Sequence, residues 1–206
     1  MNAVQRGRAL GASMLLIFSV GMFSNFSLQP ALFADGGLLV NAAERPGSIG
    51  LVCLLALSTG LVSTWIASML TAWLRDDAPV LARFYFAVVV AGLALSLVEA
   101  STIYAFQRLS TLYHDSAGEP GMAFSAAAAS LAGLRNGIHY LDKLLGGVGV
   151  LLLFALLLTL RLLPRPIALF GLVASGIQML GVGQGVLGRD VNHLLLAPLA
   201  LAFVIT

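Results

Sequence analysis

One carboxylate stands out as a candidate for chemistry, because it lies inside a long apolar stretch of the sequence. Glu99 is embedded in the run Ala-Leu-Ser-Leu-Val-Glu-Ala-Ser-Thr-Ile that covers residues 94–103. If that run crosses a membrane, an ionised carboxylate within it costs on the order of 3 kcal/mol even on lenient insertion scales. Such a side chain faces the interior of a helix bundle, where it is protonated or paired. Two interpretations stay open: a carboxylate that binds a proton or a substrate, and a structural ion pair between helices.

Candidate partners for Glu99 recur along an alanine-rich segment further down the chain. Arg135, His139 and Lys143 follow one another at a spacing of four residues, which places them on one face of a helix. Asp142 lies three residues beyond His139, close to the same face. We expect Glu99 to lie against this face, in a salt-bridge network or in a ligand or proton site. Pairing with Arg135 or Lys143 would keep the carboxylate ionised and structural, whereas pairing with His139 alone would allow protonation to change near neutral pH.

A metal site is a further alternative for the same residues. Glu99, His139 and Asp142 are of the types that bind metal ions. The His-x-x-Asp spacing is short and occurs by chance in many helices, so no metal is predicted.

Four small residues near the C-terminal end of the sequence form a candidate site for helix packing. Gly171 and Ser175 are four residues apart, and so are Gly181 and Gly185. Small residues at this spacing let two membrane helices approach closely. We therefore predict that this helix packs tightly through these residues. The alternative is a substrate cavity lined by flexible glycines and by two neighbouring glutamine amides.

The composition identifies lipid as the solvent of this chain. Hydrophobic residues make up 59% and charged residues 10% of the 206 residues, whereas a soluble domain carries charge on roughly 25% of its positions. The net charge of +2 comes from arginines scattered between apolar blocks, so nucleic acid is not an expected partner. Cys53 is the only cysteine, which excludes an internal disulfide and a site with several cysteine ligands.

Motifs of known enzyme chemistry are missing from the sequence. It has no nucleophile elbow, no phosphate-binding glycine loop and no His-Glu-x-x-His motif. The three histidines, His114, His139 and His193, fall in or beside the connections between apolar runs, so haem ligation by facing helices is not expected. We predict a protein that is not an enzyme and that holds no cofactor.

Apolar runs long enough to span a membrane define the predicted fold. A bilayer core about 30 Å thick needs about 20 apolar helical residues, and the runs that qualify are 9–28, 48–74, 80–106, 144–163 and 166–187. A sixth run, 193–206, is too short to cross alone. The first run exceeds the roughly 7–15 residues of a signal-peptide core, which predicts a retained helix. We predict an all-α, polytopic transmembrane bundle of about six helices that forms a single domain over residues 1–206.

One connection between these runs is long. Residues 113–121, near its start, have the composition of a loop. Residues 122–140 are rich in alanine and predict a helix, either lying at the membrane interface or continuing directly into the next span. The segment 107–143 is therefore predicted to be an outer connection that is partly helical.

The distribution of arginine and lysine predicts the orientation. If the N-terminus is cytoplasmic, six fall on the inner side: Arg6, Arg8, Arg75, Arg83, Arg161 and Arg165. Five fall on the outer side: Arg45, Arg108, Arg135, Lys143 and Arg189. Counting the short connections alone sharpens the difference, because Arg135 and Lys143 belong to the long connection, where the positive-inside rule is diluted. We predict a multi-pass protein of the cell inner membrane with a cytoplasmic N-terminus.

Three stretches of the sequence resemble one protein family. Residues 8–17 (Arg-Ala-Leu-Gly-Ala-Ser-Met-Leu-Leu-Ile) are similar to its opening helix, residues 97–100 (Leu-Val-Glu-Ala) to its third-helix motif, and residues 146–166 to its fourth helix and following Pro-Arg turn. The family is the bacterial integral-membrane group catalogued as domain of unknown function 4386. Its members often carry arginine two residues before the Val-Glu motif, where this chain has Ser96. The resemblance implies a bacterial multi-helix membrane protein and no known activity.

The predicted function is that of a non-catalytic membrane subunit, or of a protein that binds membrane lipid or a membrane-protein partner, including a second copy of itself. Short connections and small-residue packing faces support this prediction. The alternative is a small-molecule or proton-coupled permease, which Glu99 and the outer polar cluster would serve.

Overall fold

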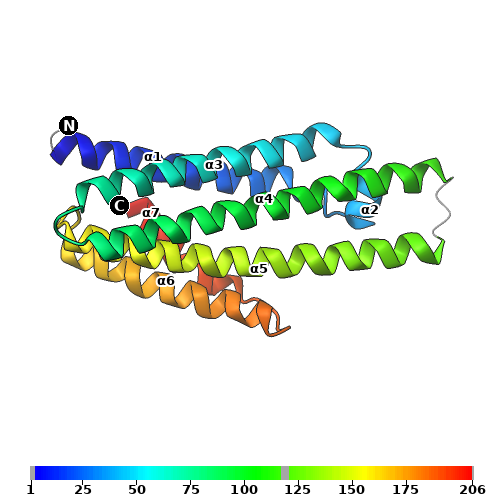
Figure 1. Cartoon of the computed structure of the whole chain (residues 1–206). Helices are drawn as coiled ribbons and strands as arrows, with labels where there is room; N and C mark the ends of the chain where they lie inside the picture. Colours follow the sequence, from blue (N-terminus) through cyan, green and yellow to red (C-terminus); the bar gives the residue numbers. More distant parts are fainter. Residues whose placement is uncertain (1–2, 117–120, 206) are drawn as a thin grey trace. The chain divides into compact units, whose positions relative to one another are not determined.

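The computed structural model describes residues 3–116 and 121–205, and these residues form helices and short connections without strands. In chain order the elements are α1 (Ala3–Phe23), the π-helix η1 (Ser24–Leu28), α2 (Gly37–Asn41), α3 (Pro46–Trp73), α4 (Pro79–Asp115), α5 (Met122–Thr159), α6 (Arg165–Val186), the 3₁₀-helix η2 (His193–Leu196) and α7 (Ala197–Ile205) (Figure 1).

Five stretches of the described helices are long and apolar enough to cross a membrane: α1 with η1, α3, α4, α5 and α6. The sixth predicted run is a 3₁₀ turn followed by the nine-residue α7, which is too short to span. These findings confirm the predicted all-α polytopic bundle. The chain is an integral membrane protein.

The helices α4 and α5 are longer than the sequence predicts. Residues 113–115 were expected in a loop, but α4 continues to Asp115, so that expectation is wrong for these three residues. Residues 117–120 of the expected loop lie outside the described residues. α5 begins at Met122 and runs without a break to Thr159. The alanine-rich segment therefore continues directly into the next span, which was one of the two predicted forms.

Polar side chains explain why α4 extends past its apolar part. Ser110 is fully buried, and its Oγ accepts a hydrogen bond of 2.9 Å from the backbone N–H of Ala43. One turn later, Nε2 of His114 lies 2.9 Å from the backbone oxygen of Val40. Both contacts attach the α2–α3 connection to the last turns of α4. The polar residues that resemble loop composition are thus used for packing within a helix.

The chain divides into two compact units. The first comprises residues 1–18, 60–93 and 140–206, and the second comprises residues 19–59 and 94–139. Four helices, α1, α3, α4 and α5, contribute residues to both units.

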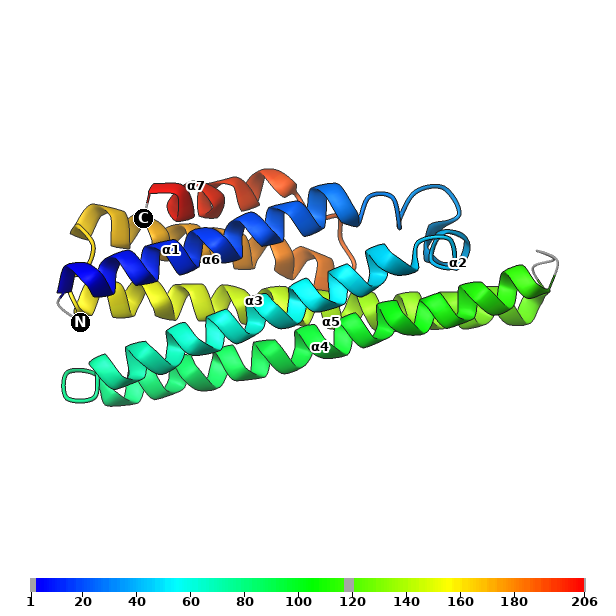
Figure 2. The same ribbon diagram turned by 90° about the horizontal axis from the view of Figure 1, so that it is seen from above.

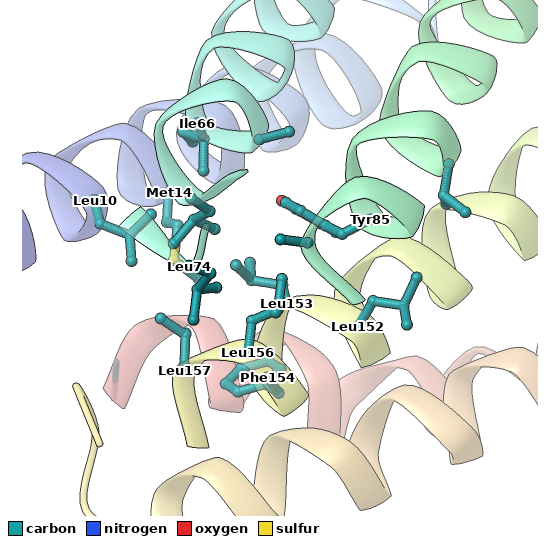
Figure 3. Close-up of a cluster of buried hydrophobic side chains, with 14 of the residues drawn as sticks. Leu10, Met14, Ile66, Leu74, Tyr85, Leu152, Leu153, Phe154, Leu156 and Leu157 are labelled. Carbon is teal, nitrogen blue, oxygen red and sulfur yellow. The ribbon is translucent and has the colours of Figure 1, made fainter. Parts of the chain in front are cut away.

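The core of the first unit gathers leucines and aromatic rings from six helices (Figure 3). Its buried side chains include Leu10, Met14, Ile66, Leu70, Leu74, Tyr85, Leu152, Leu153, Phe154, Leu156, Leu157 and Leu199. Phe154 of α5 is fully buried and lies over Gly171 of α6, where any larger side chain would collide with the ring. The absence of a side chain at Gly171 therefore allows α5 and α6 to pack closely, as expected for helices in lipid.

The core of the second unit forms around the α2–α3 connection. Its buried residues are Leu32, Leu38, Ala42, Ile49, Val52, Ile103 and Phe106, with alanines and a leucine of α5 packed against them. The α2 helix, which the sequence analysis does not anticipate, supplies Leu38 to this core. The second unit holds Glu99 and its contacts.

Candidate functional site

Glu99 of α4 is paired with two side chains of α5 inside the second unit. Its Oε1 lies 3.0 Å from Nη2 of Arg135 and 2.9 Å from Nδ1 of His139. The side chains of Glu99 and Arg135 are each only 12% exposed. A carboxylate in a membrane-spanning helix is expected to be shielded and compensated in this way.

Helical geometry explains why these two side chains reach the same carboxylate oxygen. Arg135 and His139 are four residues apart on one continuous helix, so they project from the same face, one turn apart. The long α5 also carries this face past α4 at the level of Glu99. The sequence spacing therefore predicts the pairing correctly for Arg135 and His139.

Arg135 has two further neighbours in the second unit. Its guanidinium carbon lies 4.8 Å from the centre of the Phe33 ring, in a cation–π contact. Its Nη1 donates to Oδ1 of Asn136 over 3.3 Å. Its Nε is buried and has no hydrogen-bond partner among the described residues. The guanidinium is thus held on three sides, with one donor left unused.

Phe33 and Asn136 are contacts that the sequence analysis missed. Phe33 lies in the connection between η1 and α2, outside every apolar run, and no periodicity signals where that connection passes. Asn136 follows Arg135 directly, so its contact depends on side-chain rotation rather than on helical spacing.

The other two predicted members of the cluster, Asp142 and Lys143, lie in the first unit. Nζ of Lys143 is 3.0 Å from Oδ2 of Asp142, and the Asp142 side chain is buried. The predicted partner Lys143 therefore neutralises its neighbour in the sequence. Across the residues that the structure describes, no group of three or more His, Cys, Asp or Glu side chains could hold a metal ion.

The small residues of α6 lie at close helix contacts within the first unit. A side chain at Gly185 would approach Cε1 of Tyr140 to 2.5 Å, and one at Gly181 would approach Cβ of Leu195 to 3.0 Å. Ser175 is fully buried, and its Oγ donates to the backbone oxygen of Gly171 over 2.7 Å. These four positions face α5, η2 or the α6 backbone itself.

The arrangement around Glu99 combines a guanidinium group with an imidazole ring. Arg135 lies within pairing distance, so the carboxylate does not depend on His139 for its counter-charge. Nδ1 of His139 adds a contact of 2.9 Å to the same carboxylate oxygen. Chemically, the site can fix α4 against α5 through an ion pair and a hydrogen bond.

Comparison with known proteins yields a family without an assigned activity. No curated protein and no solved structure matches the chain. One family model matches residues 9–206, which includes four of the five spanning stretches in full and all but two residues of the first. The chain therefore belongs to the family described as Domain of unknown function (DUF4386).

Proposed function

We propose that the chain is a non-catalytic, multi-pass protein of the cell inner membrane that binds lipid or a membrane-protein partner, with its N-terminus in the cytoplasm. One observation carries the proposal. The charged side chains in the middle of α4 and α5, which are Glu99, Arg135, Asp142 and Lys143, all take part in ion pairs with one another. Each acidic group is compensated by a basic one: the Glu99–Arg135 pair joins α4 to α5, whereas the Asp142–Lys143 pair lies within α5.

A transport carboxylate has different requirements from a structural one. It needs a partner that can release it, so that a proton or substrate can replace that partner during the cycle. A guanidinium group forms a strong, directional pair with a carboxylate, which a proton or substrate does not readily replace. The Glu99–Arg135 distance of 3.0 Å therefore favours a structural role.

Lipid is the expected neighbour of most of the helix surface. Large apolar side chains are exposed along the spanning helices; Val173 is 62% and Leu180 is 74% exposed on α6 alone. Such exposure would be unfavourable in water and is ordinary in a bilayer.

The ion pairs of α5 also support the cytoplasmic N-terminus. Arg135 and Lys143 are engaged within a spanning helix, so they no longer count as charges of an outer connection. On the outer side this leaves Arg45 and Arg189 in connections and Arg108 near the end of α4, against six arginines on the inner side. The positive-inside rule then favours the proposed orientation more strongly than the sequence count does.

A second candidate function, a proton-linked permease, is favoured by one observation. Nδ1 of His139 lies 2.9 Å from Glu99, so a proton on the ring has an acceptor at hand. A liposome experiment separates the two functions. The purified chain is reconstituted into liposomes that contain a pH-sensitive dye. The buffer outside the liposomes is then made more acidic than the buffer inside.

The proposed function predicts that liposomes with the wild-type chain acidify no faster than empty liposomes. Rapid acidification by the wild-type chain that Glu99→Gln abolishes would contradict it and select the permease. Asp115→Asn is the matched control, because Asp115 is an exposed carboxylate on the last turn of the same helix. This control should behave like the wild-type chain in either case.

A further inference from the structure

Three segments of the first unit meet at one of its ends. These are the start of α1, the turn between α3 and α4, and the turn between α5 and α6; both views show them at the same end (Figures 1 and 2). All three belong to the same unit. We call this end of the unit, with its exposed arginines, the arginine face.

The arginine face carries five exposed guanidinium groups: Arg8, Arg75, Arg83, Arg161 and Arg165. In the described part of the chain, none of the five forms an ion pair. The acidic residues of these segments are Asp76 and Asp77, both in the α3–α4 turn. The face therefore presents more positive than negative charge. Nε of Arg83 donates to the backbone oxygen of Pro79, which leaves the charge of that guanidinium without a carboxylate partner.

The backbone at Arg161 gives independent evidence that this side chain has a use. α5 ends in a Schellman motif, in which the N–H of Leu162 bonds to the oxygen of Leu157 over 3.1 Å and the N–H of Arg161 to that of Leu158 over 3.2 Å. The motif requires a left-handed residue, and Arg161 has φ 55°. Such a conformation is strained for a residue with a side chain.

The end of α6 shows how the same chain builds this motif without strain. There the N–H of Arg189 bonds to the oxygen of Gln184 over 2.9 Å and that of Gly188 to Gly185 over 3.1 Å, with Gly188 at φ 72°. Glycine takes the left-handed position at α6, whereas Arg161 takes it at α5. Strain of this kind persists where a side chain serves a function.

The start of α6 adds a favourable field to the arginine face. Pro164 precedes the helix and offers no side-chain cap, and the first turn contains no acidic residue. The positive end of the helix dipole therefore stands uncompensated next to Arg165. Trp73 and the exposed Phe84 lie on the neighbouring helices α3 and α4, near their ends at this face, and aromatic rings of this kind settle at the headgroup level of a bilayer.

We propose that the arginine face binds the phosphate groups of anionic phospholipids, with Arg161 and Arg165 as the central contacts. The inference rests on the proposed lipid-binding function and names the lipid class and the site. Anionic headgroups fit because they match the unpaired positive charge and lie at the depth of the aromatic rings.

The test uses the purified full chain in a mild detergent, with native mass spectrometry as the readout. The probes are dioleoylphosphatidylglycerol and dioleoylphosphatidylcholine, added separately at equal concentration. The wild-type chain should retain phosphatidylglycerol, which carries a net negative charge, in preference to the zwitterionic phosphatidylcholine. Added salt should weaken this preference. Arg161→Gly should lower the apparent affinity for phosphatidylglycerol about fivefold, as expected for the loss of one arginine at an anionic surface.

Arg161→Gly removes the side chain without disturbing the backbone, because glycine readily adopts the left-handed conformation. The thermal midpoint of this variant should not fall below that of the wild-type chain. Arg165→Gln should also weaken retention. The controls Arg108→Gln and Arg189→Gln remove exposed arginines that lie outside the arginine face, near the end of α4 and after α6, and should retain the lipid like the wild-type chain.

Equal retention of the two lipids by the wild-type chain would overturn the inference, and so would equal losses in the test and control variants. Displacement of the lipid by an equal concentration of inorganic phosphate would also overturn it, because the site would then serve a soluble anion. These outcomes leave the liposome result untouched. Conversely, proton flux lost in Glu99→Gln would overturn the proposed function and leave the lipid preference standing.

Discussion

At the scale of single residues, the identity of the partner decides what a buried carboxylate can do. Glu99 is joined to a guanidinium and an imidazole through the same oxygen. The guanidinium supplies the counter-charge, and the imidazole adds a hydrogen bond. Because Arg135 is itself packed against Phe33, the pair is anchored at both ends. Glu99 is therefore best understood as a link between α4 and α5.

Removing one member of this pair should be more harmful than removing both. Glu99→Gln leaves the charge of Arg135 buried and is expected to lower the free energy of unfolding by about 3 kcal/mol. The double variant Glu99→Leu with Arg135→Met replaces the pair by apolar groups of similar size and should recover most of that loss. Thermal unfolding in a mild detergent measures both. A double variant as unstable as the single one would show that the ion pair is not what stabilises this region.

The sequence permits a partial prediction of this site. The apolar surroundings of Glu99 and the four-residue spacing of Arg135 and His139 follow from the helical repeat, which is local. The contact with Phe33 does not, because it depends on the path of an irregular connection. The separation of Lys143 from Arg135 into different units depends on how the long helices divide, and no local pattern encodes that.

At the scale of helices, the sequence predicts where each helix lies better than it predicts where α4 and α5 end. Each apolar run of the sequence forms a helix over most of its described residues, yet α4 and α5 both extend beyond their apolar parts. The extension of α4 is held by Ser110 and His114, which bind the backbone of the α2–α3 connection. The polar composition of this segment is typical of a loop, and the sequence does not reveal the distant backbone groups that its side chains bind.

Ser110→Ala tests this account of the α4 extension. The change leaves the backbone N–H of Ala43 without its acceptor, and the expected loss of stability is about 1–3 kcal/mol. Ser101→Ala is the matched control on the same helix, because Oγ of Ser101 donates only to Leu97 of its own helix. Its effect should stay within about 0.5 kcal/mol. Equal thermal midpoints for the two variants would refute the role of Ser110.

The packing of α6 can be tested with two glycines on one helix. A methyl group at Gly171 would collide with the Phe154 ring, whereas one at Gly176 meets no atom within 4 Å. Gly171→Ala should destabilise the chain by about 1–3 kcal/mol through overpacking. Gly176→Ala should be neutral or slightly stabilising, because alanine favours the helix. Similar thermal midpoints for the two variants would mean that the α5–α6 contact is not as close as described.

At the scale of the whole molecule, the positions of the arginines and the crossings of the helices predict one arrangement in the membrane. Five spanning stretches alternate in direction, so the α3–α4 and α5–α6 turns lie on the side of the N-terminus. That side carries six arginines, whereas Arg135 and Lys143 of α5 are engaged in ion pairs. The proposed lipid site, the orientation and the multi-pass topology all depend on this arrangement.

Thiol labelling in intact cells tests this arrangement most directly. In a Cys53→Ala background, single cysteines replace Glu44, Ser116, Asp190 or Asp77, which are all exposed in connections. The account predicts that a membrane-impermeant maleimide labels cysteines 44, 116 and 190 in intact cells, and labels cysteine 77 only after permeabilisation. Labelling of cysteine 77 in intact cells, with the other three protected, would contradict the cytoplasmic N-terminus. Labelling of all four would contradict the spanning of the membrane itself.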